Sequence, residues 1–381
     1  MALSLRGVRL VGADATVDLT IDGGVIAAIT PGRRQHPGDG AELTVARGFV
    51  DMHVHGGGGA SFDALDPDEI RAAAAYHHRH GSTTMLASLV TAPSERLRRS
   101  CALLGDLAAA GVVAGIHLEG PFLSARRCGA QDPRFIVPPD VGLLERLWQD
   151  AAGRVSMVTV ACEHPGALEV IEWCVGHDVL AAIGHTDADA ETTQRAIDAG
   201  ARVATHLFNA MPPVHHRAPG AAGALLADPR VTCELIFDGD HIAPTIAAIV
   251  VAAAGVHRVA AVTDAISASG LADGEHTLGG LDVNVRAGVA RLAGNGALAG
   301  STTTMDASLR QILSWGVALP DALTMLSTTP ALRLGVHEEL AVGAGADLVV
   351  LDARQRLQGV LRAGAPVPGL PLSSTWATEP A

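Results

Sequence analysis

Aromatic residues are scarce in this sequence, and long apolar runs and paired cysteines are missing. Phe, Trp and Tyr make up 3% of 381 residues while apolar residues make up 48%, so the core must consist mainly of Ala, Val, Leu and Ile. No segment reaches the ~18 uninterrupted apolar residues of a membrane span, and the N-terminus lacks the apolar stretch of a secretory signal. The five cysteines are odd in number and form no CxxC pair, which argues against a disulfide framework. We therefore expect a globular protein of the cytoplasm.

Positive charge is also in short supply. The chain has 27 Lys and Arg residues against 40 Asp and Glu residues, a formal net charge of −13. This balance argues against nucleic acid or an anionic membrane as the main partner. Any phosphate group in a ligand would need a local basic site.

Apolar runs and helical stretches alternate regularly through the middle of the chain. Strands are expected at residues 48–53, 83–90, 112–119, 155–161, 179–184, 202–206, 231–237 and 258–264. Helical stretches between them often begin at Asp or Ser and end at Gly, as capped helices do. This alternation favours an α/β fold with a (β/α)8 TIM barrel over an open sheet.

The two ends of the chain differ from this middle part. Short β-branched runs near the N-terminus and again near the C-terminus predict strands, so we expect one small β-sandwich domain from residues 1–47 and 336–381. The barrel then occupies residues 48–335 as the catalytic domain. Two irregular segments interrupt it: an Arg/Pro/Gly-rich loop at 120–139 and a predicted β-hairpin insertion at 270–299.

The stretch GFVDMHVHGGGG, residues 48–59, contains His53 and His55 at the end of the first barrel strand. Side chains at i and i+2 of a strand share a face, so both imidazoles can reach one point. The glycines that follow allow a sharp turn and close approach of a ligand. The pair alone fits half of a metal site, or two surface or core histidines at a turn.

Other strand ends supply further candidate ligands. They are Glu119 in GIHLEGPF, His185 in AAIGHTDA, His206 in VATHLFNAMP and Asp264 in AVTDAIS. In barrels of this kind the active site lies at the C-terminal ends of the strands. Taken singly, Glu119 could be an ion-pair partner and His185 a neighbour of a helix cap. Taken together, the set predicts a metal site.

Six strings carry a resemblance to a known family: DMHVH, HLEGPF, GHTDA, THLFNAM, VTDA and LAGSTTTMD. They resemble those of the N-acetylglucosamine-6-phosphate deacetylases, which belong to the amidohydrolase superfamily. The resemblance covers about residues 48–335. It implies hydrolysis of the acetamide of N-acetylglucosamine 6-phosphate to glucosamine 6-phosphate and acetate, a step of amino-sugar catabolism. Glu119 would take the position that many superfamily members fill with a carboxylated lysine.

The resemblance also implies a ligand set for one or two divalent metal ions per chain. Glu119, His185 and His206 would hold the first ion. His53, His55 and Asp264, with Glu119 bridging, would hold a second. Zinc is the first expectation, with Fe, Mn, Co, Ni or Cd as alternatives. Family members without the first-strand histidines work with one metal, so this sequence is expected to accommodate two.

The metal and Asp264 are each expected to have a role in this hydrolysis. A metal lowers the pKa of a bound water from ~15.7 towards ~7, so that hydroxide attacks the acetyl carbonyl at neutral pH. Asp264 is expected to take the proton from the water and deliver it to the departing amine, acting as general base and then general acid.

By the same resemblance, Asn209, Ala210, Arg217 and His241 match positions that contact the sugar and its phosphate. A guanidinium fork suits a phosphate, and the phosphate site can be completed across a subunit interface, so we expect a homodimer. One departure concerns the lid, where the family usually has a histidine and this chain has Gln131. Gln131 can donate an N–H to the substrate carbonyl, but it does not titrate near neutral pH.

Three other functions are alternatives to this interpretation of the sequence. The same reaction on the galactosamine epimer would use the same strand-end residues. A cyclic-amide hydrolase resembling dihydroorotase or hydantoinase usually relies on a carboxylated lysine, and this chain has Glu119 there. A catalytically dead barrel kept as a scaffold would lack a ligand or a base, and the sequence lacks neither.

Overall fold

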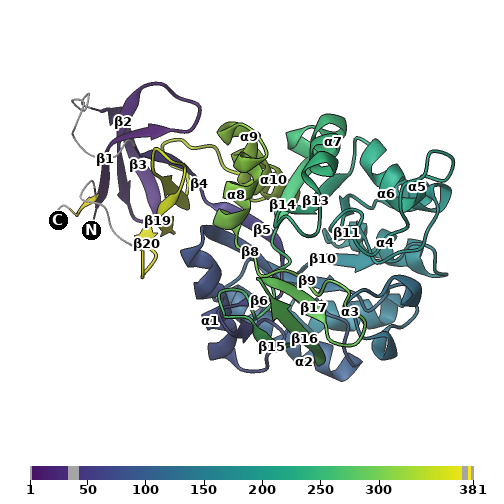
Figure 1. Cartoon of the computed structure of the whole chain (residues 1–381). Helices are drawn as coiled ribbons and strands as arrows, with labels where there is room; N and C mark the ends of the chain where they lie inside the picture. Colours follow the sequence, from purple (N-terminus) through teal and green to yellow (C-terminus); the bar gives the residue numbers. More distant parts are fainter. Residues whose placement is uncertain (1, 33–42, 371–375, 379–381) are drawn as a thin grey trace.

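The computed structural model describes residues 2–32, 43–370 and 376–378. Figure 1 shows a large barrel with its surrounding helices, and a smaller sheet beside it that contains both ends of the chain. Among the helices of the described residues, none is long and apolar enough to cross a membrane.

Parallel strands form the barrel, and they follow one another in the sheet in chain order. In the described part of the chain this sheet has eight strands. They are β5 (Phe49–Val54), β8 (Ser82–Val90), β9 (Gly115–Glu119), β10 (Val155–Val160), β11 (Leu180–Ile183), β12 (Val203–Ala204), β13 (Thr232–Ile236) and β14 (Val259–Val262). The predicted strands therefore lie where the sequence placed them, within a few residues, and the predicted α/β barrel is confirmed.

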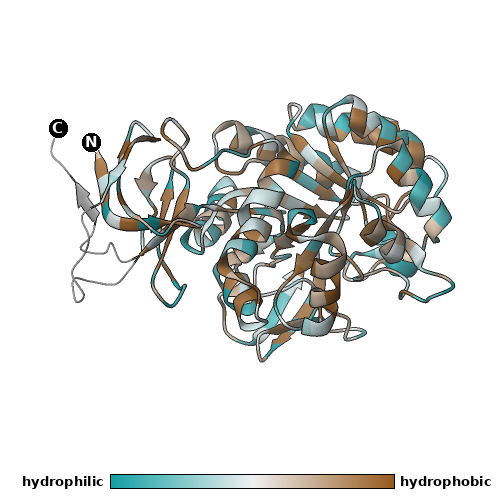
Figure 2. Cartoon of the chain, turned by 90° about the horizontal axis from the view of Figure 1, so that it is seen from above, coloured by the Kyte–Doolittle hydropathy of each residue, from teal (hydrophilic) through white to brown (hydrophobic). Residues whose placement is uncertain are grey.

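Helices surround the barrel: the first seven connect one barrel strand to the next, and the last three follow the final strand, β14. They are α1 (Pro67–Arg79), α2 (Ser94–Ala109), α3 (Val141–Asp150), α4 (Ala167–Gly176), α5 (Ala190–Ala199), α6 (Gly220–Ala227), α7 (Pro244–Ala254), α8 (Met305–Ser314), α9 (Leu319–Leu323) and α10 (Thr329–Leu334). Shorter helical turns are η1 (Ala125–Arg127), η2 (Pro133–Phe135), η3 (Val256–Arg258) and η4 (Thr324–Thr328). Figure 2 shows hydrophobic strands at the centre and hydrophilic residues on the outer helices.

Several helices begin at the aspartates that the sequence suggested as caps. The side chain of Asp66 accepts a hydrogen bond from the backbone N–H of Asp68, and Asp189 accepts one from Thr192. Such caps satisfy backbone donors that have no partner within the helix and stabilise it by about 1 kcal/mol. They fix where α1 and α5 start.

The strands from both chain ends form one sheet. Its members are β1 (Leu3–Leu10), β2 (Thr16–Asp22), β3 (Val25–Pro31), β4 (Thr44–Arg47), β18 (Leu348–Leu351), β19 (Leu357–Arg362), β20 (Ala365–Pro366) and β21 (Trp376–Thr378). In the sheet, β18 lies between β19 and β4, and β4 lies next to β1. A separate apolar cluster, which includes Leu5, Val45 and Leu348, is its core. The predicted joining of the two termini in a small β domain is thus present.

The insertion at residues 270–299 contains one strand more than the predicted hairpin. It is a sheet of β15 (Gly274–Leu278), β16 (Leu281–Arg286) and β17 (Val289–Leu292), each antiparallel to the next. The side chain of Asp273 accepts hydrogen bonds from the backbone N–H groups of Ala287 and Gly288, which holds the turn between β16 and β17. A shorter ribbon, β6 (Gly56–Gly57) and β7 (Ala60–Ser61), lies within the glycine-rich stretch.

The first and last barrel strands meet through residues at their ends. The backbone N–H of Asp264 donates to the carbonyl of His53 over 2.8 Å, and that of His55 donates to Ala265 over 2.8 Å. Below them, the hydroxyl of Thr263 donates to the carboxylate of Asp51 over 2.6 Å. This junction brings His53, His55 and Asp264 to the same point.

Candidate metal centre

A cavity of about 260 Å³ opens at the C-terminal ends of the barrel strands. Its lining includes the predicted ligands His55, Glu119, His185, His206 and Asp264. A wider groove of about 980 Å³ between α2, α3 and α4 contains none of these residues. These five predicted ligands therefore line the smaller cavity and not the groove.

Glu119, His185 and His206 form the first group of candidate ligands, from β9 and from the loops after β11 and β12. Oε1 of Glu119 lies 3.0 Å from Nε2 of His185 and 3.0 Å from Nε2 of His206. The two Nε2 atoms are 3.1 Å apart. All three side chains are buried, so their polar atoms face one another rather than solvent.

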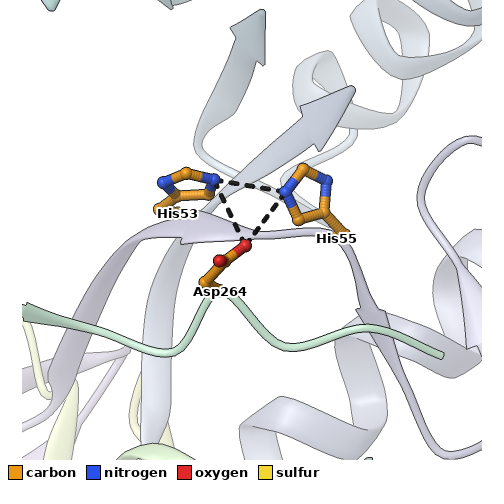
Figure 3. A group of neighbouring side chains, drawn as sticks. All are labelled: His53, His55 and Asp264. Carbon is orange, nitrogen blue, oxygen red and sulfur yellow. Dashed lines mark hydrogen bonds and ion pairs between the residues drawn. The ribbon is translucent and has the colours of Figure 1, made fainter. Parts of the chain in front are cut away.

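His53, His55 and Asp264 form the second group, at the junction of the first and last strands (Figure 3). The Nε2 atoms of the two histidines are 3.2 Å apart. Oδ1 of Asp264 lies 3.2 Å from Nε2 of His55 and 3.5 Å from Nε2 of His53. The i, i+2 spacing does direct both imidazoles to one point, as the sequence suggested.

Glu119 lies between the two groups. Its Oε1 faces His185 and His206, and its Oε2 lies 3.2 Å from Nε2 of His55. One carboxylate thus offers an oxygen to each group. This is the placement that a bridging ligand requires.

The spacing of these atoms fits a divalent metal. Zinc–nitrogen bonds of ~2.0–2.1 Å at tetrahedral angles place two ligand nitrogens roughly 3.3 Å apart. The Nε2 pairs of the two groups, at 3.1 and 3.2 Å, are close to that separation. Imidazole and carboxylate together are a donor set that suits zinc and other first-row divalent ions. The residues present therefore fit the divalent metal ion that the fold implies.

Hydrogen bonds on the far side of the rings orient the histidines. Nδ1 of His55 lies 3.2 Å from the carbonyl oxygen of Ser88, and Nδ1 of His185 lies 2.9 Å from that of Arg127. A donor proton on Nδ1 leaves the lone pair on Nε2, which points into the centre. The Arg127 carbonyl belongs to the loop at 120–139, so this loop directly supports a candidate ligand.

Opposite charges in the centre change the pKa values of both kinds of group. Burial lowers the pKa of His53, but the carboxylates of Glu119 and Asp264 outweigh it and raise that pKa well above its ordinary value. The same competition raises the pKa of His55 to about 9. Burial raises the pKa of Glu119 and Asp264, yet the imidazoles hold both below their ordinary values. Because imidazole must be neutral to bind a metal, metal binding at these residues would release protons.

Backbone conformation at the ligands is unusual. His185, His206 and Asp264 have φ values of 47°, 27° and 49°, in the left-handed region. Residues other than glycine adopt this region at a cost of about 1–3 kcal/mol each, and such residues gather at functional sites. These three residues lie just after β11, β12 and β14, in the turns that follow the strands.

Gln131 is buried against the first group. Its side-chain nitrogen donates to Oε2 of Glu119 over 2.6 Å, and its oxygen accepts from the backbone N–H of Thr91 over 2.7 Å. The sequence suggested a donor to the substrate carbonyl, and Gln131 does line the cavity. Its amide hydrogen bonds, however, go to a candidate metal ligand and to the chain after β8.

The candidate substrate residues divide into two groups. Asn209, Ala210 and His241 line the cavity, and Nδ1 of His241 lies 2.6 Å from a carboxylate oxygen of Asp238. Arg217 is exposed and outside the cavity lining, with its guanidinium 2.7 Å from Nε2 of His216.

Sequence reasoning missed two polar side chains inside the barrel. Glu234, in the middle of β13, lies 3.2 Å from Nδ1 of His53. His117 lies between the hydroxyls of Ser88 and Thr159, at 2.9 and 2.8 Å, and burial lowers its pKa well below the ordinary value. Signals for both existed. Glu234 is a charged residue in an apolar strand, and His117 shares a strand face with Glu119.

Comparison with known proteins agrees with this geometry. Residues 44–371 match the amidohydrolase family. The N-acetylglucosamine-6-phosphate deacetylase of Bacillus subtilis is 35% identical over 82% of this chain and 82% of its own length. The N-acetylgalactosamine-6-phosphate deacetylase of Escherichia coli O157:H7 is also 35% identical, over 93% of this chain and 97% of its own.

Solved structures give the same result. One is an aspartate-to-alanine variant of the N-acetyl-D-glucosamine-6-phosphate deacetylase of Mycobacterium smegmatis, in complex with N-acetyl-D-glucosamine-6-phosphate. It has a TM-score of 0.87 and 45% identity, covering 92% of this chain and 94% of that one. The enzyme of the same name from Thermotoga maritima has a TM-score of 0.87 at 29% identity, covering 96% and 99%. The chain belongs to the amidohydrolase family, and within it to the N-acetylglucosamine-6-phosphate deacetylases.

Proposed function

We propose that this chain hydrolyses the acetamide of N-acetylglucosamine 6-phosphate, releasing glucosamine 6-phosphate and acetate, with one or two divalent metal ions per chain. The observation that carries the proposal is the convergence of two ligand groups on Glu119 at the mouth of the barrel. The names of the relatives from Bacillus subtilis and Mycobacterium smegmatis support the choice of substrate. Zinc is the first candidate for the metal, with Fe, Mn, Co, Ni or Cd as alternatives.

A divalent metal bound by these ligands would acidify a water molecule and polarise the acetyl carbonyl. Asp264 then accepts the proton of the attacking water. Its carboxylate suits this task because its pKa is held low by the nearby imidazoles against the effect of burial, so it starts ionised. Asp264 passes the proton to the amine, which is a poor leaving group until protonated.

The remaining cavity residues hold the sugar. Asn209, Ala210 and His241 line the space next to the ligands and are proposed to contact the sugar and its phosphate. Gln131 braces Glu119 while the substrate binds. Arg217 is exposed and follows shortly after Asn209 and Ala210 in the sequence. It is proposed to bind the phosphate within a homodimer whose interface completes that site.

A second candidate is the same hydrolysis of N-acetylgalactosamine 6-phosphate. The relative from Escherichia coli O157:H7 that carries this name matches 93% of the chain at 35% identity, the same identity as the Bacillus subtilis relative. The two sugars differ in the orientation of one ring hydroxyl, which lies away from the acetamide. The metal groups would serve both equally.

Acetate release from the two N-acetylhexosamine 6-phosphates and their unphosphorylated parents, measured side by side, tests the proposal. We expect metal-dependent turnover with the highest kcat/KM on N-acetylglucosamine 6-phosphate. A higher kcat/KM on the galactosamine epimer would transfer the assignment to the second candidate. Failure of the metal-loaded protein to release acetate from either phosphorylated sugar would refute both.

A further inference from the structure

Glu234 is a fully buried carboxylate that the catalytic proposal does not use. It lies in the middle of β13, a strand that consists mostly of apolar residues. Oε2 lies 3.2 Å from Nδ1 of His53 and accepts the backbone N–H of His206 over 3.2 Å. Within the described part of the chain, Oε1 has no hydrogen-bond partner. Burial of a partly unpartnered carboxylate is costly, so its retention here calls for a specific task.

The contact with His53 supplies such a task. A neutral imidazole has one donor nitrogen and one acceptor nitrogen. A carboxylate beside Nδ1 requires the proton to be on Nδ1, which leaves the lone pair of Nε2 directed at His55 and Asp264. Glu234 thereby determines which tautomer His53 adopts and where its ring points.

His53 differs in this respect from the other candidate histidine ligands. Nδ1 of His55 and Nδ1 of His185 face backbone carbonyl oxygens, which are neutral acceptors. Nδ1 of His206 is buried and has no hydrogen-bond partner among the residues described. A carboxylate increases the electron density of the imidazole more than a carbonyl does, so His53 is the ligand whose donor strength depends most on its neighbour.

The second contact of Glu234 reaches the other ligand group. Because Oε2 also accepts the backbone N–H of His206, one carboxylate oxygen contacts a residue from each group. The His53 and His206 rings stack with their centroids 5.5 Å apart. The contact of Glu234 with His206 is to its backbone, whereas the contact with His53 is to the imidazole itself, so Glu234 acts on the ligand atoms through His53.

We propose that Glu234 is a positioning residue that fixes the Nδ1–H tautomer of His53 and sets the metal affinity of the position formed by His53, His55 and Asp264. This inference rests on the proposed function, since it requires that position to hold a metal. The position formed by Glu119, His185 and His206 keeps its own side-chain contacts when Glu234 is neutralised.

The test is a calorimetric Zn²⁺ titration of metal-free protein, comparing wild type with Glu234→Gln. His53→Asn identifies which binding step belongs to the position containing His53. In Glu234→Gln we expect that step to weaken by ~10–100-fold, the typical effect of removing such a partner, and the other step to stay unchanged. Excess Zn²⁺ should restore activity to the variant. Asp306→Asn is a matched control. Asp306 lies 2.9 Å from Nδ1 of His80, and neither residue is among those that line the cavity.

Three other results of the titration would overturn the inference. Wild-type affinity at both steps in Glu234→Gln overturns the inference and leaves the proposed function standing. Equal weakening of both steps also overturns it, because that result indicates general support of the fold. Wild-type protein that binds a single metal overturns the inference and leaves the proposed function standing, because that function allows one metal ion per chain.

A measurement on wild-type protein covers the case in which Glu234→Gln fails to fold. Nitrogen-15 NMR of histidine-labelled, zinc-loaded protein reports which ring nitrogen carries the proton, and His53→Asn assigns the signal. We expect a protonated Nδ1 on His53. An unprotonated Nδ1 overturns the inference.

Discussion

The side-chain amide of Gln131 joins Glu119 to the backbone of Thr91, through hydrogen bonds of 2.6 Å to the carboxylate and 2.7 Å from the Thr91 N–H. Glu119 is the residue that both ligand groups share. The loop at 120–139 therefore contacts the candidate metal centre through a neutral amide.

Gln131→Leu should lower kcat/KM while leaving the barrel folded. The substitution keeps the volume but removes the donor to Glu119, and loss of a hydrogen bond to a charged group costs about 1.5–3 kcal/mol. If that loss appears in the transition state, kcat/KM falls by ~10–100-fold. Steady-state kinetics and metal content measure it. Gln149→Leu is the control, because Gln149 donates to Glu145 on the exposed surface of α3. Unchanged kcat/KM would show that the contact is unimportant for turnover.

Asp264→Asn should bind substrate and lose turnover. The amide keeps the size of the side chain but cannot accept the proton of the attacking water, and general-base catalysis contributes ~10²–10⁴-fold to a rate. Single-turnover kinetics and substrate titration separate the two effects. Asp228→Asn serves as the control, because Asp228 bonds Arg230 and Gln194 away from the cavity. A near-wild-type rate in Asp264→Asn would remove Asp264 as the base.

Arg217→Ala should impair the phosphorylated sugar selectively. Arg217 is exposed and proposed to bind the phosphate, and a charged hydrogen bond contributes about 1.5–3 kcal/mol, which is ~10–100-fold in kcat/KM. Assays on N-acetylglucosamine with and without the 6-phosphate test this. Arg195→Ala, in an exposed i, i+4 pair with Glu191 on α5, is the control. An equal loss on both sugars contradicts the phosphate role.

His77 should make the fold less stable in mild acid. Burial lowers its pKa to about 4, partly offset by its hydrogen bond to the carbonyl of Gly56. The unfolded chain has a His pKa of ~6.5 and binds the proton more readily, so stability is full above that pH and declines as pH falls towards 4. Between pH 7 and 5 the loss from this residue is about 2 kcal/mol.

Denaturant unfolding of metal-free protein at the two pH values checks this, with His77→Gln as the comparison. The glutamine can still donate to Gly56 but does not titrate. We expect the variant to lose less stability than wild type over the same interval. Identical pH dependence of the two proteins would show that His77 is not a source of the acid sensitivity.

Much of the fold and the candidate ligands could be predicted from sequence because their signals are local. The ends of barrel strands meet at one face, so reading the residue after each apolar run located His185 and Asp264 without any knowledge of packing. The extra strand of the insertion was missed because β17 is short and its pairing with β16 depends on the Asp273 turn.

The contacts that support the ligands were not predictable in this way. Gln131 and Glu119 are 12 residues apart, and Glu234 and His53 are 181 residues apart. Which polar atoms meet depends on the rotation of each strand in the closed barrel and on how the lid loop packs. The sequence shows a glutamate at position 234 within a mostly apolar strand, but it does not show which residue that glutamate contacts.

The junction between β5 and β14 has a consequence for how the protein is made. His53 leaves the ribosome long before Asp264, and their backbones bond only when the last strand meets the first. The position shared by His53, His55 and Asp264 therefore does not exist in a partly synthesised chain. Uptake of the proposed metal at that position would report that the nascent barrel has closed, and its binding energy would stabilise the closed form against reopening.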